Sequence, residues 1–259
     1  MAFGLSLPEI YAHTAHYLFI LSRIAVLLHV APVFGDKAVS RRLRTALGFV
    51  ITLLLAPVLP EPQAELLSAE GGWILLREAV TGAAIGLTLQ LIFSAVRLSG
   101  EIIGMQMGLS FANFYDPGSG NSPVISRILN LLLTLLFLTF NGHLWILNLL
   151  AESFTILPVS SAPLLSAGMM KLAGYAGLIF SQGLMLGLPV IALLLCINMT
   201  LGLLNRLAPQ LSIFVIGFPL TLTAGMVALY LMAPSMPVFT EHLTARVFSA
   251  AYEVLRALN

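Results

Sequence analysis

The segment "LGLLNRLAPQLSIFVIGFPL", residues 201–220, sets a single arginine between two long apolar runs. Arg206 is the only charged residue between Lys171 and Glu241. A helix needs about 20 mainly apolar residues to cross the hydrocarbon core of a bilayer. Because long apolar runs lie on both sides of Arg206, the segment predicts two membrane helices joined by a short polar turn.

The rest of the chain has the composition of an integral membrane protein. Of its 259 residues, 59% are hydrophobic and only 9% are charged, and the mean hydropathy is +0.99. A soluble globular domain carries far more charge. Continuous leucine-rich runs exclude the alternating pattern of a membrane barrel, and the chain has no basic cluster interleaved with aromatics for nucleic acid. We therefore expect an all-α, polytopic helical bundle in a single membrane domain.

Six apolar segments are candidate spans: residues 12–34, 45–60, 72–96, 128–150, 174–204 and 210–234. The connection after the first span is basic and by the positive-inside rule should face the cytoplasm; it carries Lys37, Arg41, Arg42 and Arg44. With strict alternation, Arg206 also faces the cytoplasm and both chain ends lie outside. The acidic connection then lies outside; it carries Glu61, Glu65 and Glu70.

Three local features should modify these helices. Pro189 and Pro219 each remove a backbone hydrogen bond and predict kinks. Asn141 and Gly142 predict a weak point in the fourth span. Residues 241–258 carry apolar positions at helical spacing, which predicts an amphipathic helix against the membrane surface or a neighbour; these are Leu243, Val247, Ala250, Ala251 and Val254.

Glycines recur every four residues at Gly100, Gly104 and Gly108. Small residues at this spacing share one helix face and let another backbone approach closely. Two interpretations stay open: tight packing within the chain, and contact with another subunit.

A loop interrupts the apolar pattern directly after these glycines. "FANFYDPGSGNSP" combines bulky aromatics with residues that favour turns and release the backbone from a helix; they are Phe111, Phe114, Tyr115, Asp116, Pro117, Gly118 and Gly120. The aromatics either pack against the bundle or fill an opening, because non-helical backbone at membrane depth needs protein or a water-filled cavity around it.

Charges inside apolar spans are functional candidates because lipid penalises them. Arg97 and Glu101 are four residues apart and can pair within one helix. Arg77 and Glu78 are adjacent, so we expect them on different faces, near the outer boundary, where their charges reach water. His143 is more often a hydrogen-bond donor at such a position than a ligand or a proton relay.

Signatures of enzymes and cofactors are absent from the sequence. The chain contains no "HExxH", no "GxSxG" and no phosphate-binding glycine loop. One carboxylate, Asp116, follows Tyr115, and a single acid cannot form the dyad of an aspartyl protease. Cys196, the single cysteine, excludes a disulfide framework and predicts a buried thiol. We expect no enzyme, no metal site and no cofactor.

Three long motifs resemble the FliR family of flagellar biosynthetic proteins, which includes the export-gate subunits of virulence-type type III secretion. They are "GEIIGMQMGLSFANFYDPGSG", "LLFLTFNGHLW" and "LLNRLAPQLSIFVIGFPLTLTAG", and the likeness covers nearly the whole chain in order. It implies a multi-pass protein of the bacterial inner membrane and the flagellar basal body. It also implies a core subunit that joins FliP and FliQ in an export gate for unfolded flagellar subunits, with FlhB and FlhA as further partners.

The same resemblance implies a division of the chain. Residues 1–171 would be a FliP-like front part, in which the loop near 111–120 plugs the pore at rest, with Gly118 and Gly120 as its hinge. Residues 172–259 would be a FliQ-like hairpin with an amphipathic tail. The cytoplasmic tip of that hairpin would be formed by Asn205, Arg206, Pro209 and Gln210. Much of the apolar surface would then face other subunits.

A different class of protein remains an alternative. Helices broken at Pro189 and Pro219 could frame the small-molecule site of a secondary transporter. Coupled transporters place ionisable groups near the middle of the membrane, whereas the C-terminal hairpin contains no acidic residue. A scaffold without a channel is a third possibility, and it gives the loop at 111–120 no mobile role.

Overall fold

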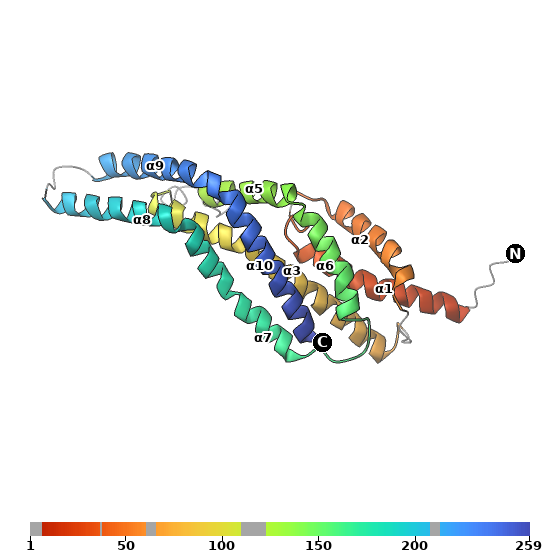
Figure 1. Ribbon diagram of the computed structural model, residues 1–259. Coiled ribbons are helices and arrows are strands. Elements are labelled where there is room, and N and C mark those ends of the chain that lie inside the picture. Colours follow the sequence, from red (N-terminus) through yellow and green to blue (C-terminus); the bar gives the residue numbers. More distant parts are fainter. Residues whose placement is uncertain (1–6, 37, 61–65, 110–122, 208–212) are drawn as a thin grey trace. The chain divides into compact units, whose positions relative to one another are not determined.

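The computed structural model describes residues 7–36, 38–60, 66–109, 123–207 and 213–259. Every regular element in these ranges is a helix. The chain divides into two compact units, which are described separately below (Figure 1). The first unit comprises Met1–Gln90, Asn141–Tyr175 and Arg246–Asn259, and the second comprises Leu91–Phe140 and Ala176–Ala245. The prediction of an all-α, polytopic membrane protein is confirmed.

The first unit is built around α1 (Leu7–Val30), which lies beside α2 (Arg41–Leu55) (Figure 1). Ser40 caps the start of α2: its side-chain oxygen accepts a hydrogen bond from the Leu43 N–H, which satisfies one of the free donors at the helix start. α2 continues into a short 3₁₀ turn, Ala56–Val58.

The long helix α3 (Ala69–Gln106) supplies its N-terminal half to this unit and packs on α1. Gly82 leaves room for the Arg23 carbonyl of α1, and a Cβ on Gly86 would lie 2.8 Å from Val30 Cβ. Close backbone approach at small residues is the usual way in which membrane helices pack.

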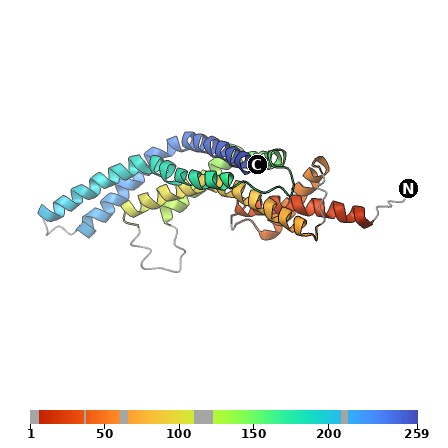
Figure 2. The same cartoon turned by 90° about the horizontal axis from the view of Figure 1, so that it is seen from below.

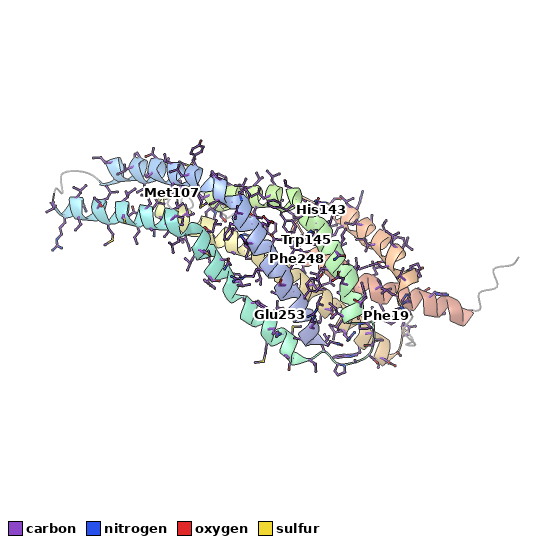
Figure 3. The ribbon with its side chains drawn as sticks, in the orientation of Figure 1. Phe19, Met107, His143, Trp145, Phe248 and Glu253 are labelled. Carbon is purple, nitrogen blue, oxygen red and sulfur yellow. The ribbon has the colours of Figure 1, made fainter. Side chains whose placement is uncertain are left out.

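Three further helices complete the first unit: α6 (Gly142–Ile156), α7 (Ser166–Tyr175) and the last part of α10 (Met236–Leu258). Trp145 of α6 meets Phe248 of α10 edge to face, with ring centroids 5.5 Å apart (Figure 3). At the end of the chain, Leu258 accepts a hydrogen bond from the Leu165 N–H at 3.2 Å.

The predicted amphipathic helix at the C-terminus is confirmed, and it starts at Met236, five residues earlier than expected. Its whole apolar stripe is buried within the chain: Leu243, Val247, Ala250, Ala251 and Val254. Arg246, Glu253 and Arg256 lie on the exposed face. The stripe packs inside this protein, so it needs no membrane surface.

The second unit contains the C-terminal part of α3, α5 (Val124–Thr139), α8 (Gly177–Leu207), α9 (Ile213–Met232) and the start of α10. α8 and α9 run side by side as a hairpin in both views (Figures 1 and 2). α8 also packs on α3, because Gly187 leaves room for Ser99: a Cβ there would lie 2.7 Å from its Oγ. Pro189 and Pro219 lie inside α8 and α9.

By length and composition, four helical segments of the described chain could cross a membrane: His13–Val30, Ala69–Gln106, Ser166–Leu207 and Ile216–Leu258. A fifth arises if α5 and α6 form one broken span. Each of the six predicted segments contains a helix in its described part, but α2 has only 15 residues and falls short of a crossing.

Two predictions about single residues had different outcomes. The weak point at Asn141 is confirmed, because this residue adopts a left-handed conformation with φ of 57° between α5 and α6. The prediction of a buried thiol is wrong, since Cys196 is exposed on α8. The apolar run around Cys196 reflects a helix whose surface remains uncovered by its own chain.

Candidate functional site

The glycine face of α3 lies in the second unit, where it crosses α5. A Cβ on Gly100 would collide with the backbone of Ser126, and the Ser126 Oγ donates a hydrogen bond of 3.0 Å to the Arg97 carbonyl. α3 and α5 therefore touch backbone to backbone at this point. Packing within the chain, one of the two interpretations of the glycine pattern, accounts for Gly100.

The other two glycines have looser surroundings. A Cβ on Gly104 would meet Pro123 Cβ at 3.5 Å, which is an ordinary contact, although Gly104 itself is buried within the chain. Gly108 has a φ of +79°, which favours glycine over other residues, and it lies against the Phe218 ring of α9. Contact of this face with another subunit stays a prediction.

The last residues of α3 are held by both helices of the hairpin. Asn198 of α8 donates through Nδ2 to the carbonyl oxygen and to the Oε1 of Gln106, each at 3.1 Å. Thr221 of α9 places its Oγ1 3.4 Å from the Met107 carbonyl. The Met107 side chain fills the space that a Cβ on Gly225 would take (Figure 3). The point from which the chain leaves α3 is thus anchored on two sides.

Several predicted site residues lie outside the described part of the chain. These are the loop residues Phe111, Phe114, Tyr115, Asp116, Pro117, Gly118 and Gly120, and the hairpin-tip residues Pro209 and Gln210. Asn205 and Arg206 are described, and both are exposed on the last turn of α8. The plug and the hairpin tip therefore stay predictions.

Arg97 and Glu101 lie one turn apart on α3, with Arg97 exposed and Glu101 half-buried. Among the residues that the structure describes, the ion pairs within 4.0 Å join Arg23 or Arg77 to Glu78, and Lys171 to Glu253. Arg97 and Glu101, although both are described, form no ion pair within 4.0 Å.

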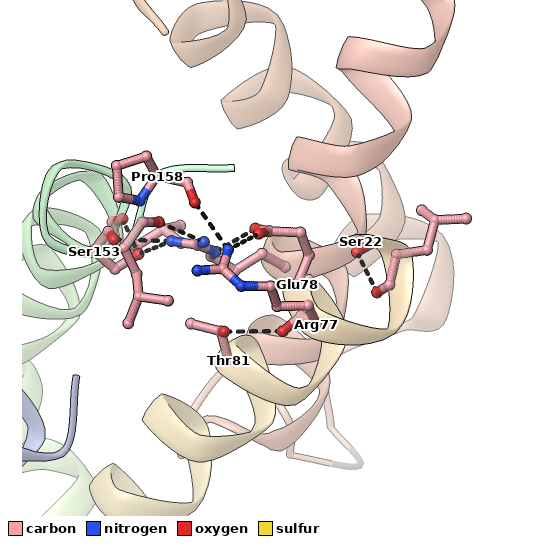
Figure 4. A network of polar contacts seen from close by, with 10 residues as sticks. Ser22, Arg77, Glu78, Thr81, Ser153 and Pro158 are labelled. Atoms are coloured by element: carbon pink, nitrogen blue, oxygen red, sulfur yellow. Dashed lines mark hydrogen bonds and ion pairs between the residues drawn. The ribbon is translucent and has the colours of Figure 1, made fainter. Parts of the chain in front are cut away.

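A buried polar network in the first unit was missed by the sequence reasoning, which overlooked Arg23. The Arg23 Nε lies 2.6 Å from the Glu78 Oε2, and neither side chain has any exposed surface. The remaining nitrogens of Arg23 donate to α6 and to the residue after it: Nη1 to the Ser153 carbonyl at 2.9 Å and Nη2 to the Leu157 carbonyl at 2.8 Å. Figure 4 shows this network at close range.

Arg77 and Glu78 belong to the same network, so their predicted position near water is wrong. The Arg77 Nη1 lies 3.3 Å from the Glu78 Oε1 and donates to the Pro158 carbonyl at 2.8 Å (Figure 4). Both side chains are buried. The network joins α1, α3 and α6 and has a structural role. Its charged groups are shielded from solvent and are stabilised by groups of opposite charge and by carbonyl oxygens.

The sequence held a signal for this network. Arg23 interrupts the apolar run of the first span, and an arginine within a span requires a partner inside the protein. Glu78 was the acid available in another span, but the two residues are 55 positions apart. Their pairing depends on which faces of α1 and α3 meet, and local periodicity does not contain that information.

The described residues contain no group of three or more metal-binding side chains. His143, on the first turn of α6, is half-buried, and its Nδ1 has no hydrogen-bond partner in the described structure. The expectation that this histidine is a satisfied donor is therefore not met at Nδ1.

Long apolar helices, a charge network sealed inside one unit and an apolar hairpin in the other define a polytopic α-helical membrane protein. Comparison with known protein families shows to which family of membrane proteins the chain belongs. The chain belongs to the bacterial export proteins, family 1, whose family model matches residues 14–247.

The chain is similar to curated proteins named flagellar biosynthetic protein FliR. It is 51% identical to the one from Pectobacterium carotovorum subsp. carotovorum over 92% of this chain and 91% of the relative. It is 46% identical to the one from Escherichia coli (strain K12) over 93% of each, and 27% identical to that of Bacillus subtilis (strain 168) over 93% of each. The chain is thus a membrane component of a flagellar export system.

Proposed function

We propose that this chain is a core subunit of the flagellar export gate and forms, with FliP and FliQ, the channel that passes unfolded flagellar subunits across the bacterial inner membrane. The observation that carries the proposal is the apolar surface left uncovered on the α8–α9 hairpin. In the candidate span of α3, 67% of the most apolar 18-residue stretch is buried within the chain. The corresponding share is 28% in each of the spans that contain α8 and α9. A helical pair this exposed is suited to contact other membrane helices.

The loop at residues 111–120 is proposed as the plug that closes the channel at rest. It begins directly after the end of α3 that Asn198 and Thr221 hold. A fixed base supports such a role, because a loop that closes a pore needs a defined starting position. Its three aromatic side chains supply bulk, and the glycines at 118 and 120 supply backbone freedom for opening.

The proposal includes the assembly and its place in the cell. FlhB and FlhA are the further partners expected at the cytoplasmic side, and the flagellar basal body is the site of action. The chain contributes a conduit, and its buried charges Arg23, Arg77 and Glu78 hold helices together.

Deletion of residues 111–118 tests the plug. In a complex reconstituted into planar bilayers, we expect the deletion to leave copurification of FliP and FliQ unchanged and to produce a steady ion conductance that the wild-type complex lacks. Conductance equal to that of the wild type, in a variant that still assembles, would contradict the plug. The gate itself is tested by purification of the wild-type chain in mild detergent: a homogeneous monomer without copurifying subunits would overturn it and favour a transporter.

A further inference from the structure

We propose that Arg97 and Arg127, together with the outer side of α5, form a binding site for an anionic membrane phospholipid. All the residues concerned lie in the second unit, on α3 and α5. The proposal rests on the membrane location of the protein and holds whether or not the chain acts as an export gate.

The two arginines originate at one helix crossing. The Ser126 Oγ donates to the Arg97 carbonyl at 3.0 Å, and Gly100 permits backbone contact with Ser126. Arg127 is the next residue after Ser126, and both arginine side chains are exposed. The backbone positions that carry the two arginines are therefore close together on two different helices, and both arginines are exposed near this crossing.

Neither guanidinium is neutralised by a carboxylate in the described part of the chain. Within the described residues, no carboxylate lies within 4.0 Å of Arg97 or Arg127. The nearest acid along α3, Glu101, is half-buried and makes no ion pair with Arg97. An unpaired arginine is costly in hydrocarbon, so where this surface faces lipid the crossing is favoured at the level of the lipid headgroups. There, the planar guanidinium forms paired hydrogen bonds with phosphate oxygens.

An apolar stripe begins beside the two arginines and runs along α5. Exposed residues recur at helical spacing: Val124, Ile128, Leu131, Leu135 and Leu138. The opposite face is buried: Ile125, Leu129, Leu133 and Phe137. Between Val124 and Leu138 the helix rises about 21 Å at about 1.5 Å per residue. The hydrocarbon of one leaflet is about 15 Å thick, so the stripe is long enough to accompany an acyl chain.

The order of charged and apolar residues along α5 matches the direction of a bound phospholipid. Arg127 lies one turn before Leu131, at the N-terminal end of the stripe, so the charged and apolar parts follow the order of a phospholipid from headgroup to chain. An acidic protein segment would satisfy the arginines but leave the stripe uncovered. An anionic phospholipid satisfies both parts at once, and basic surfaces between membrane helices are known binding places for such headgroups.

The test compares two lipids with identical acyl chains. The purified full-length chain in mild detergent is incubated with equal amounts of palmitoyl-oleoyl phosphatidylglycerol and phosphatidylcholine, and bound lipid is counted by native mass spectrometry. We expect the wild type to prefer phosphatidylglycerol. Each basic residue contributes about a fivefold change in affinity. The double variant Arg97→Gln/Arg127→Gln should therefore bind phosphatidylglycerol about 30-fold more weakly, and its affinity for phosphatidylcholine should be unchanged.

Three variants make the result decisive. Arg97→Lys/Arg127→Lys keeps the charges and should retain most of the preference, and Arg206→Gln, which removes another exposed arginine, should retain all of it. Leu131→Ser should weaken the binding of both lipids to the same extent. If the double glutamine variant does not remain monodisperse, Arg127→Gln is measured instead, with about a fivefold loss expected.

Two results would overturn the proposal. One is equal binding of the two lipids by the wild type. The other is an unchanged lipid preference in the glutamine variant; if that variant also loses a copurifying protein subunit, the arginines belong to an acidic protein partner.

Discussion

The Arg23 Nε and the Glu78 Oε2 are 2.6 Å apart and join α1 to α3 without any contact with solvent. The Cζ of the same guanidinium lies 4.2 Å from the centre of the Phe154 ring, so aromatic and carbonyl groups of α6 surround the cation. Removing one partner of a buried pair leaves the other charge uncompensated, and this costs far more than the pair itself contributes.

Glu78→Gln is therefore expected to destabilise the protein strongly. Loss of the carboxylate leaves Arg23 and Arg77 buried with no counter-charge, and the expected cost is about 3–5 kcal/mol in free energy of unfolding. Thermal unfolding in detergent, followed by fluorescence, measures the loss. Glu70→Gln, an exposed acid at the start of the same helix, is the matched control and should unfold as the wild type does. Equal stability of the two variants would refute the structural role of the network.

Gly100→Ala and Gly104→Ala should differ in stability although they lie on one helix face. A methyl group at Gly100 meets the backbone of Ser126, which cannot rotate away, whereas one at Gly104 makes an ordinary contact with Pro123 at 3.5 Å. We expect Gly100→Ala to cost about 1–3 kcal/mol by overpacking and Gly104→Ala to be neutral or slightly stabilising, because alanine favours the helix. The same unfolding assay measures both variants. A larger loss of stability in Gly104→Ala than in Gly100→Ala would contradict the observed crossing of α3 and α5.

Lys171→Met should have no measurable effect on thermal stability. The Lys171 Nζ lies 3.5 Å from the Glu253 Oε2, but both side chains are about half exposed, and ion pairs of that kind contribute little. Glu253 also keeps the hydrogen bond that it accepts from the Tyr175 hydroxyl at 2.6 Å. A large fall in the unfolding midpoint would contradict this expectation and show that the pair of Lys171 with Glu253 contributes to stability.

Arg206→Gln tests the end of the α8–α9 hairpin. Arg206 is exposed on the last turn of α8, so its replacement should leave folding and copurification of FliP and FliQ at wild-type levels. We expect secretion of flagellar subunits to fall, measured as exported protein in the culture medium. Normal secretion would indicate that Arg206 only anchors the helix at the membrane boundary.

Much of the fold was predictable because helices in membranes are local structures. Each span has to satisfy its own backbone hydrogen bonds, so apolar run length and periodicity locate it. For the same reason the break at Asn141 and the buried stripe from Leu243 to Val254 were both visible in the residues themselves. The exception is α2, where apolar composition extended beyond the residues that form the helix, Arg41–Leu55.

Features that depend on two separate segments were not predictable in this way. The glycine repeat indicated close packing, yet only the structure showed that Ser126 of α5 meets Gly100. Arg77 and Glu78 were expected to reach water from α3, but α1 brings Arg23 to Glu78 and the charges lie in the core of the first unit. Cys196 was expected to be buried because its neighbours are apolar, whereas the structure leaves that side of α8 exposed.

By itself, the amino-acid sequence determined that this is a polytopic helical membrane protein, where most of its apolar helices lie and to which export family it is similar. Tertiary structure alone decided which faces meet: Arg23 with Glu78, Gly100 with Ser126, and the end of α3 with Asn198 and Thr221. The physical reason is that helix formation follows from hydrogen bonds four residues apart. Which helix faces pack together depends on the shape and charge of residues that are tens of positions apart in the sequence. Such residues become neighbours only when the chain has folded.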